Sequence, residues 1–133
     1  MNGSKVKAYS KAKDGNITLT KNFKVREFAC RDGSDAIFIS MDLVELLQKI
    51  RDHFGKPVTI NSAYRTAAYN KKVDGAAQSQ HLYGMAADIS IQGVKPADVA
   101  AFAETMLPKT GGIGIYSSFT HVDVRAVKSR WKG

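Results

Sequence analysis

The stretch "SQHLYGMAADIS", residues 79–90, decides the fold because its second half alternates as a half-buried strand does. Side chains alternate across a sheet, so Ala86, Asp88 and Ser90 share one face, and the alanine and isoleucine between them share the other. The residues before this strand, which include His81, have the small side chains and glycines of a loop. The sequence therefore predicts a loop that brings His81 to the start of a strand carrying Asp88.

A second strand with the same pattern follows further along the chain, in "THVDVR", residues 120–125. His121, Asp123 and Arg125 share one face of this strand, and two valines share the other. If the two strands are neighbours in one sheet, the carboxylate of Asp88 converges with the side chains of His121 and Asp123. We expect these polar side chains to form a single surface.

The imidazole of His81 can reach the same surface, because the loop that carries it ends where the Asp88 strand begins. Two imidazoles and one carboxylate, with a fourth position open, are the ligand set of catalytic zinc. Zinc polarises a carbonyl group and lowers the pKa of bound water to about 7. The alternative for His81, Asp88 and His121 is a satisfied polar cluster on one sheet face, and spacing alone does not separate the two.

Arg65, in "NSAYRT", residues 61–66, follows a short predicted strand and precedes the histidine segment. A guanidinium fork binds two oxygens at once, so Arg65 beside a metal suits an anionic substrate group or a developing oxyanion. The alternative for this side chain is a surface salt bridge.

Helical patterns flank the predicted strands. Residues 40–54, "SMDLVELLQKIRDHF", have apolar side chains at helical spacing, and Gly55 follows as a stop signal. A second amphipathic helix is predicted over residues 95–107, "KPADVAAFAETML", and a hairpin over residues 111–125. The sequence thus predicts an α+β fold: a small single domain with an antiparallel sheet flanked by helices.

Composition narrows the possible partners. The chain has 133 residues, 44% of them hydrophobic, and contains no apolar stretch near the ~20 residues of a membrane helix. Its net charge of +8 attracts polyanions such as nucleic acid, anionic lipid headgroups or cell-wall polymers. We expect no nucleic-acid partner, because the chain lacks an arginine-rich helix and an aromatic–basic alternation, and we expect no membrane insertion. Cys30 is the only cysteine, which excludes an internal disulfide and a thiolate metal site.

The first 20 residues are polar and rich in lysine, and we divide the chain into a basic N-terminal arm, residues 1–20, and a domain, residues 21–133. The opening "MNGSKVKAYSKAKDGN" lacks the apolar segment of a secretory signal peptide. We therefore expect synthesis in the cytoplasm without signal-directed export.

Three motifs together, "SAYRT", "SQHLYGMAADI" and "GGIGIYSSFTHVDVR", closely resemble the zinc D-alanyl-D-alanine carboxypeptidase family. That family includes L-alanyl-D-glutamate endopeptidases of phage endolysins and D-Ala-D-Ala dipeptidases. The similarity runs from about Phe23 to Trp131 and implies that residues 21–133 form a zinc peptidase domain of the hedgehog/D-Ala-D-Ala peptidase-like fold.

The resemblance implies one Zn²⁺ per chain, bound by His81, Asp88 and His121, with Arg65 in contact with the substrate or the oxyanion. Four further residues are expected to bind substrate or to support the ligands: Ser79, Gln80, Tyr64 and Ser118.

The sequence differs from the family at the position of the general base. Many relatives carry an acidic residue three positions before the last ligand, but here that position is Ser118, which is no base near neutral pH. We predict that Asp123, two residues after His121, acts as the base or orients the water. Two alternatives stay open: Asp123 pairs with Arg125 or Arg65, or Asp123 is the third ligand and His121 the catalytic imidazole.

The resemblance implies a zinc-dependent peptidase that hydrolyses an amide bond of the peptidoglycan stem peptide. The bond is that of either a D-Ala-D-Ala carboxypeptidase or an L-Ala-D-Glu endopeptidase. The alternative is a catalytically inactive, zinc-containing module of the same fold that binds the cell wall. We expect a monomer of phage or prophage origin that reaches the wall after lysis or by non-classical export.

Overall fold

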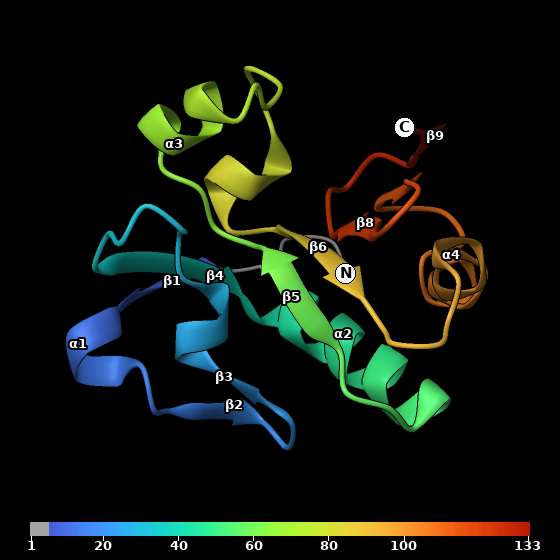
Figure 1. Cartoon of the computed structure of the whole chain (residues 1–133), viewed down its shortest axis with the longest axis horizontal. Coiled ribbons are helices and arrows are strands. Elements are labelled where there is room, and N and C mark those ends of the chain that lie inside the picture. Colours follow the sequence, from blue (N-terminus) through green and yellow to red (C-terminus); the bar gives the residue numbers. More distant parts are fainter. Residues whose placement is uncertain (1–5) are drawn as a thin grey trace.

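The computed structural model describes residues 6–133 and places its strands in three sheets (Figure 1). The strands are β1 (Val6–Ser10), β2 (Thr18–Thr20), β3 (Phe23–Lys24), β4 (Ala36–Ser40), β5 (Thr59–Ser62), β6 (Ala86–Ser90), β7 (Gly112–Ile115), β8 (Thr120–Asp123) and β9 (Ser129–Lys132). The main sheet has the order β5-β6-β8-β7-β9, and β1 pairs with β4 and β2 with β3 in two smaller sheets.

Strands β6 and β8 are antiparallel neighbours at the centre of the main sheet. Asp88 lies directly opposite His121 across this pair, and Ala86 lies opposite Asp123. The alternation expected from the sequence is therefore confirmed. Strands β7 and β8 form the predicted antiparallel hairpin. The sheet is not wholly antiparallel, however, because edge strand β9 runs parallel to β7.

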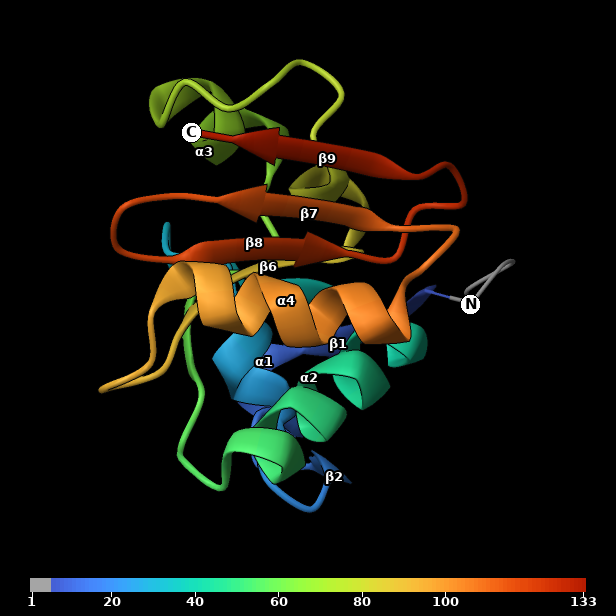
Figure 2. The same ribbon diagram turned by 90° about the vertical axis from the view of Figure 1, so that its right-hand side faces the viewer.

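Helices cover the apolar face of the main sheet. Residues 6–133 contain four α-helices: α1 (Lys11–Asp14), α2 (Met41–Phe54), α3 (Ala67–Lys72) and α4 (Pro96–Met106). Helix α2 begins and ends where the sequence predicts: the Ser40 hydroxyl accepts a hydrogen bond from the Leu43 N–H, and Gly55 is left-handed, with φ 64°. Helix α4 runs alongside β8 (Figure 2). Ile89 of β6 and Val122 of β8, on the face opposite to Asp88, are fully buried in the core.

The N-terminal segment is integrated into the fold over its described part. Strand β1 pairs antiparallel with β4 along its whole length, from Val6 opposite Ser40 to Ser10 opposite Ala36. Strands β2 and β3 pair across the boundary drawn at residue 20, with Thr18 opposite Lys24. Residues 6–20 are thus an edge element rather than a free arm, and residues 1–5 of the predicted arm lie outside the described residues.

Within residues 6–133 there are two short 3₁₀ helices, η1 (Val25–Phe28) and η2 (Gln80–Tyr83), and η2 replaces the loop predicted around His81. Helix η2 ends at Gly84, which has φ 70°, and a Cβ at this position would collide with the carbonyl oxygen of Phe38. Only glycine fits here, and this tight turn fixes how η2 enters β6. Within residues 6–133, no helix is long and apolar enough to cross a membrane.

Candidate metal centre

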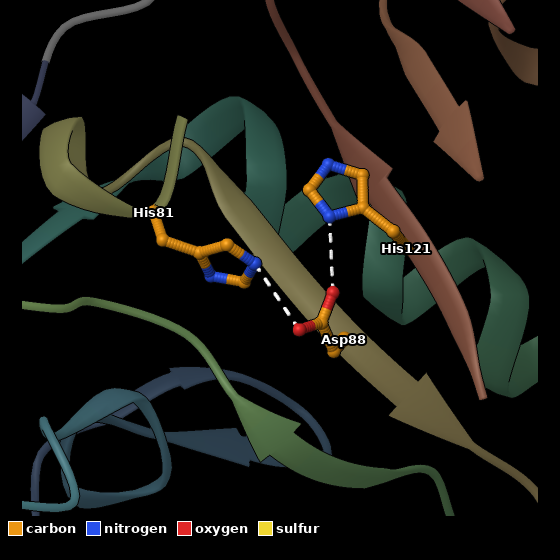
Figure 3. A group of neighbouring side chains, drawn as sticks. All are labelled: His81, Asp88 and His121. Carbon is orange, nitrogen blue, oxygen red and sulfur yellow. Dashed lines mark hydrogen bonds and ion pairs between the residues drawn. The ribbon is translucent and has the colours of Figure 1, made fainter. Parts of the chain in front are cut away.

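The three predicted ligands come together in the structure (Figure 3). Nε2 of His81 lies 3.2 Å from Oδ2 of Asp88, and Nδ1 of His121 lies 3.0 Å from Oδ1 of the same carboxylate. All three side chains are buried, and their ligand atoms lie within 4.8 Å of one another. Ligand atoms 2.0–2.1 Å from a tetrahedral zinc ion lie roughly 3.3–3.4 Å apart, so the observed spacing is close to that of a zinc site.

Each ligand is positioned by a different element of the fold. Asp88 and His121 face each other because they occupy paired positions in β6 and β8. His81 lies in η2, whose N-cap Ser79 accepts a hydrogen bond from the His81 N–H at 3.2 Å. Gly84 then turns the chain into β6, so the His81 ring returns over the strand. The site therefore combines a sheet pair with one helical turn.

Hydrogen bonds behind both imidazoles fix which nitrogen faces the carboxylate. Nδ1 of His81 donates to the carbonyl oxygen of Ala63 at 2.7 Å, so Nε2 is the ring nitrogen that faces Asp88. Nε2 of His121 contacts Oδ2 of Asp123 at 2.7 Å, which directs Nδ1 toward Asp88. Metal-binding histidines are oriented in this way by carbonyl or carboxylate groups behind the ring. The donor set thus fits zinc in both type and orientation.

The two carboxylates that contact the His121 ring, those of Asp88 and Asp123, favour a positive charge at this position. Burial alone would raise the pKa of Asp88, but hydrogen bonds from His121 and His81 hold that pKa well below its usual range. Burial alone would lower the pKa of His121, but its hydrogen bonds to Asp123 and Asp88 raise it. His81, Asp88 and His121 would hold a metal in place of the proton on His121, and the negative charges of Asp88 and Asp123 would offset its positive charge.

Asp123 lies behind His121 and is fully buried. Its Oδ1 accepts hydrogen bonds from the Gly112 N–H at 2.8 Å and from Nε of Arg125 at 2.8 Å, and its Oδ2 accepts one from Nη2 of Arg125 at 2.6 Å. The His121 ring separates Asp123 from Asp88, so the Asp123 carboxylate contacts the ring edge opposite to the ligand atoms. These contacts match the predicted alternative in which Asp123 pairs with Arg125, and its role as base stays a prediction.

The guanidinium of Arg65 also contacts the cluster of His81, Asp88 and His121. Its Nη2 lies 3.3 Å from Oδ2 of Asp88, its Nε donates to the Ser62 hydroxyl at 3.1 Å, and its Nη1 donates to Oδ1 of Asn70 at 3.2 Å. Asn70 is itself buried and donates to the Ala76 carbonyl oxygen. The alternative of a surface salt bridge does not describe this contact, because both partners are largely buried, and the predicted role of Arg65 with the substrate stays a prediction.

The side chains of His81, Asp88 and His121 line a cleft of about 460 Å³. One wall is the segment 73–80, which includes Ser79 and Gln80. The other wall is aromatic and consists of Tyr116, Phe119 and Trp131. Tyr116 and Phe119 stack with ring centroids 4.4 Å apart, and Nε1 of Trp131 donates to the Tyr116 hydroxyl at 2.9 Å.

The remaining predicted site residues lie outside this lining. The Tyr64 ring packs on Phe38, with centroids 5.3 Å apart, and burial raises the pKa of its hydroxyl. Ser118 is exposed in the turn between β7 and β8. Sequence reasoning gave no role in the site to Trp131 and Tyr116, and it named Arg125 only as a possible partner of Asp123. Trp131 is the only tryptophan of the sequence, but its local pattern, "SRWK", gives no signal that places it in the site.

Comparisons with known proteins agree with this geometry. The family model for peptidase M15 matches residues 19–123. The chain is 31% identical over 136 aligned residues to the probable peptidoglycan L,D-endopeptidase MepK of Haemophilus influenzae, covering 90% of this chain and 72% of that protein. It is 46% identical over 44 residues to the zinc D-Ala-D-Ala carboxypeptidase of Streptomyces albus G, covering 32% of this chain and 17% of that protein. The chain belongs to the peptidase M15 family.

Proposed function

We propose that the protein is a zinc-dependent peptidase that hydrolyses an amide bond in the stem peptide of peptidoglycan. The observation that carries the proposal is the orientation of His81 and His121, whose Nε2 and Nδ1 atoms respectively face the Asp88 carboxylate in a cleft. The names of the two relatives, an endopeptidase and a carboxypeptidase of peptidoglycan, support the substrate class.

The chain's own residues divide the work of such a site. His81, Asp88 and His121 would hold one Zn²⁺, which polarises the scissile carbonyl and lowers the pKa of water. The Arg65 guanidinium contacts the Asp88 carboxylate, and from this position it would stabilise a developing oxyanion. Asp123 holds the His121 ring, and acting as a base would require its carboxylate to leave Arg125.

Two experiments test this proposal in order. Metal analysis of the purified protein is expected to find about one zinc per chain, and His81→Ala is expected to lose it. His53→Ala is the matched control, because His53 stacks on Phe102 of α4 at 3.9 Å and lies outside the cleft. Digestion of purified peptidoglycan by the zinc-loaded protein should then release new amino groups, and mass spectrometry of the fragments identifies the bond.

The competing proposal is a wall-binding module that keeps zinc but does not hydrolyse. It is motivated by Ser118, which stands where many relatives carry an acidic base. Zinc binding together with co-sedimentation on peptidoglycan, but without new amino groups at any pH, would favour this module. Absence of zinc after reconstitution at neutral pH would contradict both proposals. The route to the wall, by lysis or non-classical export, and the monomeric state are proposals that neither experiment addresses.

A further inference from the structure

Arg125 is held rigidly at the rim of the cleft. Its Nε and Nη2 donate to the two oxygens of Asp123, at 2.8 and 2.6 Å, and its backbone N–H donates to Oδ1 at 3.1 Å. The guanidinium carbon lies 5.4 Å from the ring centroid of Trp131, within the range of a cation–π contact. The side chain is 28% exposed, although Asp123 beneath it is fully buried. Its guanidinium is therefore oriented before any ligand arrives.

One nitrogen of the Arg125 guanidinium, Nη1, donates no hydrogen bond within residues 6–133 and can bind a ligand. A guanidinium carries five N–H donors, and Nη1 supplies two of them. Among residues 6–133, the hydrogen bonds of the Arg125 side chain use Nε and Nη2 only. Arg125 lines the cleft together with His121 and Trp131, so this donor edge belongs to the surface that a substrate meets. A fixed guanidinium edge of this kind suits a carboxylate.

A continuous line of contacts connects the two arginines of the cleft. Arg65 contacts Asp88, Asp88 contacts His121, His121 contacts Asp123, and Asp123 contacts Arg125. The metal ligands Asp88 and His121 lie in the middle of this line. Both arginines also line the cleft, so a peptide bound there over Asp88 and His121 can meet both guanidinium groups. If Arg65 serves the scissile carbonyl, Arg125 faces a group beyond the scissile bond.

We propose that Arg125 determines specificity by binding a free carboxylate on the residue next to the scissile bond. The inference rests on the proposed peptidase function and adds to it the substrate group that is recognised. Asp123 neutralises part of the Arg125 charge, but the cation remains beside the ring of Trp131, and a hydrogen bond to an anion is stronger next to such an apolar surface than in bulk water. Stem peptides carry such carboxylates at the C-terminal D-alanine and on D-glutamate.

The test compares two substrates that differ only in this group. One peptide carries the free carboxylate beside the bond that the wild type cuts, and the other carries a carboxamide there. The wild type should prefer the carboxylate by on the order of tenfold or more in kcat/KM, mainly through KM, because one charged hydrogen bond is lost with the amide. Arg125→Met should abolish this preference, and Arg125→Lys should keep part of it.

The ratio between the substrates separates recognition from an indirect effect. If Arg125 acted only by holding Asp123 and His121, Arg125→Met would lower the rates on both peptides equally and leave the preference intact, which would overturn the proposal. Arg51→Met, on α2 outside the cleft, is the control for the loss of one positive charge. Zinc content of each variant checks that the site is still formed.

Calorimetric binding of the two peptides to the zinc-loaded protein provides a measurement that needs no turnover. A preference for the carboxylate peptide in binding that disappears in Arg125→Met supports the role of Arg125. If no peptide is cleaved, that absence of cleavage contradicts the peptidase proposal alone. Equal binding of both peptides to the wild type overturns the inference about Arg125 and leaves the peptidase proposal standing.

Discussion

At the scale of single residues, the buried carboxylate of Asp123 supports His121 from behind and is expected to act through metal affinity. Asp123→Asn removes the charge and places an amide against Nε2 of His121. Groups behind a ligand of this kind contribute about 10–100-fold to metal affinity. We therefore expect zinc affinity, measured by competition with a chelator, to fall by about that factor. Asp98→Asn, in the exposed first turn of α4, is the control and should change nothing.

The same variant separates the two roles of Asp123. Unchanged zinc affinity combined with a loss of peptidoglycan cleavage would contradict the positioning role and restore the sequence-based prediction that Asp123 is the base.

Gly84 offers a second residue-scale test. An alanine there takes up a left-handed backbone and collides with the Phe38 carbonyl oxygen. The backbone strain costs about 1–2 kcal/mol and the overpacking about 1–3 kcal/mol, so Gly84→Ala should lower the free energy of unfolding by roughly 2–5 kcal/mol. Gly33→Ala is the control, because Gly33 has φ 85° but open space around it, and it should show the strain alone. Equal losses in urea unfolding would show that the Phe38 contact is unimportant.

The residues of the site differ in how well their positions could be predicted from the sequence. Asp88 and His121 could be predicted, because alternation fixes the face of each side chain and needs only that the two strands pair. The contacts of Arg125 could not be predicted in full. Whether its guanidinium turns to Asp123, and whether Trp131 lies beside it, depends on the rotamer and on where β9 docks. Neither is encoded in the local pattern.

At the scale of elements, strand β9 is fixed to α4 by an ion pair. Glu104 of α4 accepts hydrogen bonds from Nε and Nη2 of Arg130 of β9, at 2.6 and 3.1 Å. The hydrogen bond from Arg130 is the main cause that lowers the pKa of Glu104. A carboxyl group with a lowered folded-state pKa stabilises the fold above its unfolded pKa of about 4.3 and loses this contribution as the pH falls through the folded value.

Glu104→Gln should therefore destabilise the protein only where Glu104 is ionised. Because the pair is largely exposed, the expected loss at pH 7 is about 0.2–1 kcal/mol. Urea unfolding at pH 7 and at pH 3 should show the difference between wild type and variant shrinking at the lower pH. Glu45→Gln, on an exposed position of α2, is the control. A loss that is the same at both pH values would mean that the charge of Glu104 is not its cause.

The elements differ in how well sequence predicts them. Helix α2 and strands β6 and β8 have strong local signals: a cap, a stop glycine and a clean alternation. Strands β1, β4 and β9 were missed, because β1 is short and lies in a polar segment, β9 is short and carries Arg130 and Lys132, and β4 has exposed apolar residues. Such strands form through backbone pairing with a distant partner, and the parallel pairing of β9 with β7 has no signature in either segment.

At the scale of the whole molecule, zinc is expected to stabilise the fold. The ligands come from η2, β6 and β8, which are brought together only in the folded chain. An ion that binds only the native state at 100 times its Kd adds about 2.7 kcal/mol, which raises Tm by on the order of 10 °C for a domain of this size. Thermal unfolding followed by circular dichroism, with zinc and with chelator, measures this shift. His81→Ala should unfold at the same temperature in both conditions, and a zinc-dependent shift in that variant would place the ion elsewhere.

Because β8 follows η2 and β6 in the chain, it is synthesised after them. A growing polypeptide that has emerged as far as α4 already holds His81 and Asp88, but His121 lies in a strand that follows. One imidazole and one carboxylate are too few donors to retain zinc. Until β8 docks beside β6, the nascent chain is both without a metal site and without the central pairing of its sheet. Binding of a metal by these three residues would therefore be a late step of biogenesis, because it would wait for the segment after α4.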